Sequence, residues 1–168
     1  MIQKISLREY QRGLLSRIAN PETGRAASRM GMMVGDDRWL VDLTDVGGVV
    51  PVPPMVEVPL TRPWFAGVAN IRGTLHSVVD FARFLGGAPV ALDDQTRLVL
   101  IGEKYRINSG LLVSRILGLN RDDQFQPDAG AAPMPWTIEQ YTDKQAGRWR
   151  RLDVGALVAH PDFLQVVL

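Results

Sequence analysis

The chain has 168 residues, of which 46% are hydrophobic and 22% are charged, as in an ordinary globular protein. This length allows one domain with a full core, or two small subdomains that share one. A net charge of +1 argues against broad attraction to nucleic acid or anionic lipid. The absence of cysteine excludes thiolate nucleophiles, cysteine zinc sites and disulfides, and favours a cytoplasmic location.

The first 25 residues predict an amphipathic helix followed by a linker. Ser6 and Glu9 have the spacing of a capping box, and Asn20-Pro21 ends the pattern. One apolar face is formed by Leu7, Tyr10, Leu14 and Ile18. We expect a helix over Ser6–Ala19 that packs on its own domain or docks on a partner. The chain start has no apolar signal-peptide core, and no apolar stretch is long enough to span a bilayer, so we expect no membrane insertion.

From residue 26 onwards the pattern is one of short strands separated by turn residues. Strands are predicted at Met30–Val34, Arg38–Asp42, Gly47–Val50, Phe65–Asn70, Thr74–Val79, Arg97–Ile101, Leu111–Ile116, Trp136–Tyr141 and Arg148–Leu152. Short helices are expected over 80–85, with Asp80 as the capping residue, and over 152–159, where Pro161 interrupts the chain. Many short strands are typical of small β-barrels or a sandwich.

Motifs for catalysis are missing. The chain contains no phosphate-binding glycine loop, no H-E-x-x-H and no G-x-S-x-G. His76 and His160 are its only histidines, and neither has the spacing of a metal ligand. We therefore expect no enzymatic activity, no metal and no cofactor.

A basic cluster near the C-terminus offers a nucleic-acid interpretation. Trp149 lies among Arg148, Arg150 and Arg151, and aromatic rings with arginines can bind single strands. Alternation along a strand would place Trp149 and its two neighbouring arginines on opposite faces. We expect this cluster to serve structure or protein contact, and we expect no nucleic-acid partner.

The segment from Trp64 to Asp80 is the least ordinary part of the chain. Two aromatic residues precede a strand of small residues, and Asn70 and Arg72 bracket Ile71 before Gly73. In an isolated strand, Asn70 and Arg72 would share one face while Ile71 pointed to the core. Arginine is a common interface anchor; a turn with a solvated arginine is the alternative.

These residues also carry a family resemblance. Gly67–Gly73, followed by Val78-Val79-Asp80, resembles the G-V-x-N-L-R-G … P-V-x-D-L core of the CheW family of chemosensory adaptors. Further matching stretches are Trp39–Asp42 with Val46, Met55–Pro63, Gly110–Val113 and Arg151–Asp153. The N-terminal helix and the ending Pro161–Leu164 resemble the PilI branch of that family, which serves type IV pilus (twitching) systems.

The resemblance implies a mainly β fold of two small SH3-like β-barrel subdomains that share a core over residues 26–168, with a helix at each end. It implies a non-catalytic, cytoplasmic adaptor associated with membrane receptor arrays. Its partners would be the regulatory domain of a CheA-type histidine kinase and the cytoplasmic tip of a methyl-accepting chemoreceptor. The implied polar contacts are Asn70 and Arg72 with the turn at Gly73, and the implied apolar groove contains Val46, Gly67 and Ile116.

The chain departs from the family pattern at several positions. Acidic residues usual in the family are replaced by Gly48, Ser114 and Arg115, and a proline is replaced by Ser77. Complementary charges on the partners would have to differ, which favours a dedicated receptor and kinase.

Two alternatives remain open from the sequence. The chain could be a small-molecule-binding β-barrel whose pocket is lined by Trp64, Phe65 and Trp39, or an accessory subunit of another signalling complex. It could also be a CheW-type domain that serves another output and docks through its N-terminal helix.

Overall fold

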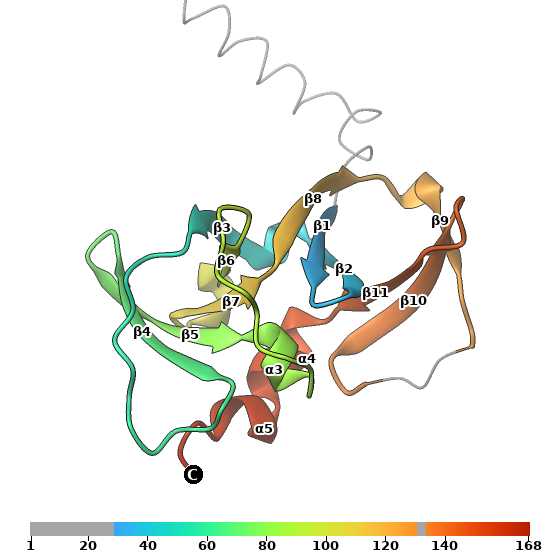
Figure 1. Ribbon diagram of the computed structural model, residues 1–168. Coiled ribbons are helices and arrows are strands. Elements are labelled where there is room, and N and C mark those ends of the chain that lie inside the picture. The colour runs from blue at the N-terminus through green and yellow to red at the C-terminus, as the bar shows by residue number, and fades with distance from the viewer. Residues whose placement is uncertain (1–28, 131–133) are drawn as a thin grey trace, which may run out of the picture.

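The computed structural model describes residues 29–130 and 134–168, which form two β-sheets that lie side by side (Figure 1). The expected helix Ser6–Ala19 lies outside the described residues. The six-stranded sheet has the order β8-β1-β2-β11-β10-β9, and the five-stranded sheet has the order β3-β6-β7-β5-β4. The five-stranded sheet comes from the middle of the described chain, between the two parts that form the other sheet.

The strands follow the predicted pattern closely. The six-stranded sheet contains β1 (Arg29–Val34), β2 (Asp37–Asp42), β8 (Arg115–Asn120), β9 (Phe125–Pro127), β10 (Thr137–Asp143) and β11 (Arg148–Leu152). The five-stranded sheet contains β3 (Val46–Pro51), β4 (Phe65–Ile71), β5 (Thr74–Asp80), β6 (Arg97–Ile101) and β7 (Ser109–Val113). Neighbouring strands run antiparallel except for β2 with β11 and β5 with β7.

The single strand expected at Leu111–Ile116 is wrong, because the chain changes sheets at Ser114. β7 is buried throughout and belongs to the five-stranded sheet, whereas β8 pairs with β1 in the other. The Ser114 N–H donates to the Met33 carbonyl (2.9 Å), and its hydroxyl accepts from the Gly35 N–H (3.1 Å). Apolar residues on both sides of Ser114 hide this change of direction from a pattern argument.

The link after β3 closes the five-stranded sheet into a small barrel. Val56 and Val68 exchange two backbone hydrogen bonds of 2.9 Å, so the link lies along the free edge of β4. Pro51, Pro53 and Pro54 lie at the end of β3 and in the link, where the missing proline donors disturb no central strand.

One core joins the two sheets. Side chains with no exposed surface come from both sheets and from the closing helix; they include Met32, Trp39, Val78, Leu98, Val113, Leu152 and Leu157. A smaller cluster of Leu40, Phe125, Tyr141 and Trp149 fills the interior of the six-stranded sheet. The expected pair of small barrels with a shared core is confirmed.

Three short α-helices lie in the described fold: α3 (Phe81–Phe84), α4 (Val154–Ala159) and α5 (Pro161–Leu164). The predicted cap of α3 is confirmed, since the Asp80 carboxylate accepts from the Arg83 N–H (3.1 Å) and from the Val90 N–H (2.9 Å). Asp153 caps α4 through the Ala156 N–H (2.9 Å), and Pro161 begins α5.

Candidate functional site

The motif around Asn70 forms the turn between β4 and β5. Arg72 (φ 52°) and Gly73 (φ 86°) are the two loop residues, and two positive φ angles are the mark of a type I′ hairpin turn. The Asn70 Oδ1 accepts from the Gly73 N–H (2.9 Å) and holds the loop. Ile71 is buried as expected. The expectation that Arg72 shares a strand face with Asn70 is wrong, because β4 ends at Ile71.

This turn presents Arg72 to solvent. The side chain is exposed and forms no hydrogen bond or ion pair with any described residue. Leu75, which pairs with Asn70 across the hairpin, is 65% exposed. We call Asn70, Arg72, Gly73 and Leu75 the hairpin tip. It offers a rigid fork of N–H donors beside an apolar side chain, which are typical components of a protein interface.

Leu75 is not among the site residues expected from the sequence. The available signal was its position: with a two-residue loop, residue 75 lies opposite the exposed Asn70 and shares its face. That signal becomes usable only when the length of the loop is known.

Gly67 has a structural task in β4. A Cβ atom at this position would lie 2.4 Å from the Val56 carbonyl oxygen, and its φ is +141°. Glycine is therefore needed for the link to approach β4. Its proposed contact with a partner stays a prediction.

Val46 and Ile116 lie in different sheets. Val46 begins β3 and pairs with Ile101, whereas Ile116 in β8 pairs with Met32. Both are half-buried and pack against the shared core. The structure thus brings Asn70, Arg72 and Gly73 together in one turn, and it places Val46 and Ile116 in other strands.

A hollow of about 630 Å³ lies between the two sheets. It is lined by the β1–β2 turn, by residues after α3 and by Ser114. Val46, Gly67 and Ile116 do not line it. The apolar groove implied by the resemblance therefore does not coincide with this hollow.

The family's missing acidic position, Gly48, lies in β3 with a φ of +156°, a backbone conformation that favours glycine. Gly47 and Gly48 lie where the register with β6 shifts, and a Cβ at Gly47 would lie 2.9 Å from the Ile101 carbonyl oxygen. The nearest carboxylate along the chain, Asp45, accepts from the Tyr105 hydroxyl (2.8 Å) and pairs with Lys104 (2.5 Å). Burial, together with this hydrogen bond, raises the pKa of Tyr105 above its usual value. Asp45 is committed to these contacts and does not replace the missing group.

Two arginines of the basic cluster form ion pairs within the six-stranded sheet. Arg150 pairs with Asp37 (3.0 Å), and Arg151 pairs with Asp42 (2.7 Å). The hydrogen bond to Asp42 raises the pKa of Arg151. Trp149 is 8% exposed and points inward, so it provides no stacking surface for a base.

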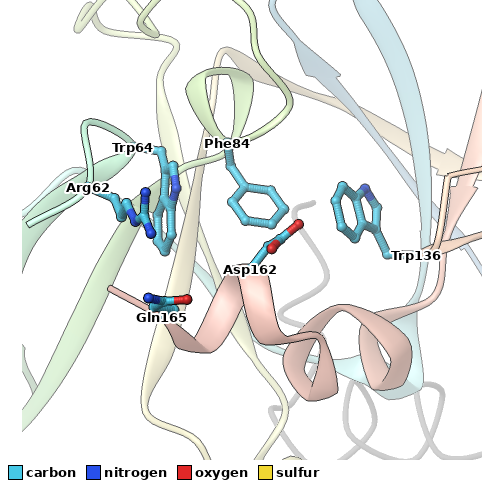
Figure 2. A pocket seen from close by; sticks show the side chains of 6 residues that line it. All are labelled: Arg62, Trp64, Phe84, Trp136, Asp162 and Gln165. Carbon is cyan, nitrogen blue, oxygen red and sulfur yellow. The ribbon is translucent and has the colours of Figure 1, made fainter. Parts of the chain in front are cut away.

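The three aromatic residues proposed for a small-molecule pocket do not line a common pocket. Trp39 is fully buried beside Phe81, with ring centroids 5.4 Å apart. Trp64 lines one hollow of about 220 Å³, and Phe65 lines a different one. Figure 2 shows Trp64 and Trp136 on either side of Phe84, with the Asp162 carboxylate below the phenyl ring. Phe84 contacts both indoles, at centroid distances of 5.2 and 5.0 Å, so aromatic packing occupies the middle of this hollow.

Residues 29–130 and 134–168 contain no group of three His, Cys, Asp or Glu side chains placed to hold a metal ion. None of their helices is long and apolar enough to cross a membrane.

Comparisons with known proteins agree with the motif. Residues 29–162 match the family model of the CheW-like domain. Protein PilI of Pseudomonas aeruginosa is 30% identical over 155 residues, which cover 89% of this chain and 85% of that protein. Chemotaxis protein CheW of Thermotoga maritima is 30% identical over 88 residues, which cover 52% of this chain and 56% of that protein.

Among solved structures, the scaffolding protein TtCheW from Thermoanaerobacter tengcongensis superimposes with a TM-score of 0.66. The match covers 82% of this chain and 95% of that one, at 14% identity, and therefore bears on the fold alone. Together these findings confirm the resemblance to the CheW family and to PilI.

Proposed function

Because the chain belongs to the CheW-like domain family, we propose that it is a non-catalytic adaptor that couples a chemoreceptor to a CheA-type histidine kinase. The likeness to PilI supports a chemosensory array that controls type IV pili. The adaptor would act in the cytoplasm, at the tips of membrane receptors. Receptor state would bias the kinase through differential contacts in one assembly.

The hairpin tip is the observation that carries this proposal. Arg72 is exposed and forms no hydrogen bond or ion pair through its side chain with any described residue, and the hydrogen bond from the Gly73 N–H to the Asn70 Oδ1 fixes the backbone of its turn. A backbone that is already ordered adds little conformational cost when the turn binds a partner. We assign the tip to the polar contacts with the kinase regulatory domain or the receptor tip.

Val46, Gly67 and Ile116 remain the candidates for apolar contact with the receptor. Val46 and Ile116 are half-buried, so each could add a small contact area without moving the core. The altered positions Gly48, Ser114 and Arg115 favour partners dedicated to this adaptor.

Replacing Arg72 by alanine tests the proposal. We expect Arg72→Ala to weaken co-assembly with the isolated kinase regulatory domain or receptor tip by about tenfold or more. The circular dichroism spectrum should not change, because the side chain is exposed and forms no hydrogen bond or ion pair within the described fold. Each partner is tested separately in a quantitative pull-down.

Arg121→Ala is the matched control. Arg121 is also exposed and forms no ion pair through its side chain with any described residue, but it follows β8 in the other sheet. The proposal is wrong if folded Arg72→Ala binds both partners as well as the unmodified chain does. Equal losses in the two variants would indicate a general charge effect instead of a contact at the hairpin tip.

A further inference from the structure

Leu60 combines two features that are unfavourable in an isolated molecule. Its φ is +60°, and its side chain is 75% exposed. A left-handed backbone costs free energy for a residue such as leucine, and an exposed leucine gains nothing from burial. The turn that holds it is closed by the Thr61 hydroxyl, which donates to the Val58 carbonyl (2.8 Å). Such a residue is better explained by a surface that is covered in an assembly.

The last residues of the chain lie beside this turn. The Leu168 N–H donates to the Leu60 carbonyl (3.1 Å), the Arg62 N–H donates to the Val166 carbonyl (2.8 Å), and Thr61 pairs with Val167. These bonds place Leu60 and Leu168 opposite each other on one face of a short ribbon, with Val167 on the other face.

Several apolar side chains are exposed on and next to this ribbon. We call Val58, Leu60, Leu164 and Leu168 the C-terminal apolar patch; their exposed fractions run from 39% to 75%. Together they expose on the order of 400 Å², as much as the largest apolar patch on a typical monomer, which is often functional. The patch lies near the start of β4, and the hairpin tip lies at its other end (Figure 1).

We propose that the C-terminal apolar patch is the interface through which two copies of this chain associate around a two-fold axis. A two-fold interface must be complementary to itself. Charges of both signs lie beside the patch, on Glu57, Arg62 and Arg83. None of these three side chains forms an ion pair with any described residue. A two-fold axis brings the carboxylate of one copy towards a guanidinium of the other, around an apolar centre.

Unpaired backbone groups of the ribbon also favour a second copy of this chain as the partner. The neighbours of Val167 use their polar groups to bond the link, so the Val167 N–H and carbonyl point to the opposite side, and neither has a partner among the described residues. Two such edges can pair antiparallel. The patch and its charged surroundings in two copies approach the roughly 1,000 Å² of a specific interface.

Self-association of the chain does not depend on the adaptor function, but the role of the dimer in a signalling assembly does. Association through the patch would leave the hairpin tip at the far end of β4 free on each copy. If the chain is an adaptor, the dimer would join two receptor–kinase units.

Sedimentation of the full chain between about 1 and 100 µM tests the inference. We expect a concentration-dependent mass that approaches twice 18.6 kDa. Leu60→Asn should weaken self-association at least tenfold without lowering the melting temperature of the monomer, because asparagine tolerates the left-handed backbone. Leu168→Asp should also weaken it.

The matched control is Leu119→Asn in β8, where the leucine is 61% exposed but distant in the fold; it should leave the dimer intact. A monomer at every concentration, or equal association in all variants, would overturn the inference. Partner binding separates the two proposals: Arg72→Ala should still dimerise, and Leu60→Asn should still bind the kinase domain and the receptor tip.

Discussion

Gly67 allows two segments of the chain to touch. The carbonyl oxygen of Val56 would lie 2.4 Å from a Cβ atom at this position. We expect Gly67→Ala to push the link away from β4, to weaken the Val56–Val68 pair, and to lower the free energy of unfolding by about 1–3 kcal/mol. Urea unfolding followed by circular dichroism measures this loss.

Gly73→Ala separates the cost of backbone strain from the cost of a steric clash at the new Cβ atom. Gly73 also has a positive φ (86°), but no atom lies within 4 Å of its missing Cβ. Its replacement should cost only the left-handed strain of about 1 kcal/mol. If Gly67→Ala is no more destabilising than Gly73→Ala, close approach is not what requires glycine at position 67.

At the level of elements, Asp143 organises the hairpin between β10 and β11. Its carboxylate accepts from the Trp149 Nε1–H (2.8 Å), the Gly147 N–H (2.8 Å) and the Gln145 N–H (2.9 Å). The Trp149 hydrogen bond makes the largest contribution and holds the pKa of Asp143 below its usual value. Because the folded pKa is lower than the unfolded one, the stabilisation is present above the unfolded pKa and is lost as the pH falls through the folded value.

Asp143→Asn tests this account. At pH 7 the free energy of unfolding of the variant should be about 1–2 kcal/mol lower than that of the unmodified chain, because charge-assisted hydrogen bonds are lost. The difference from the unmodified chain should shrink as the pH falls below 3.8, the ordinary pKa of an aspartate, and through the lower pKa of the folded chain. Urea titrations at several pH values measure it, and a difference that stays constant with pH would contradict the assignment.

The same elements show how far the sequence could be read. Alternating apolar residues predicted most strands of both sheets, and Asp80 marked the start of α3. The pattern could not reveal β9, which has only three residues and ends in Pro127, or the change of sheet at Ser114, where apolar residues continue on both sides. Which partly buried residues face a partner depends on the packing of two sheets, and no local pattern records that packing.

At the level of the whole molecule, the shared core should make the two sheets unfold together. Leu152 lies in β11 of the six-stranded sheet with no exposed surface, and it belongs to the same cluster as Leu98 and Val113 of the five-stranded sheet. The chain also crosses between the sheets at Ser114 without a flexible linker. These contacts predict one cooperative transition.

Leu152→Ala provides the measurement. Removing this side chain should lower the free energy of unfolding by about 2–5 kcal/mol, through lost burial and a cavity. Hydrogen exchange should then report an equal loss of protection in β1 and β2 and in β6 and β7, because the same global opening exposes both sets of amides. A loss confined to the six-stranded sheet would show instead that each barrel unfolds by itself, and that the shared core positions the two barrels without coupling their stability.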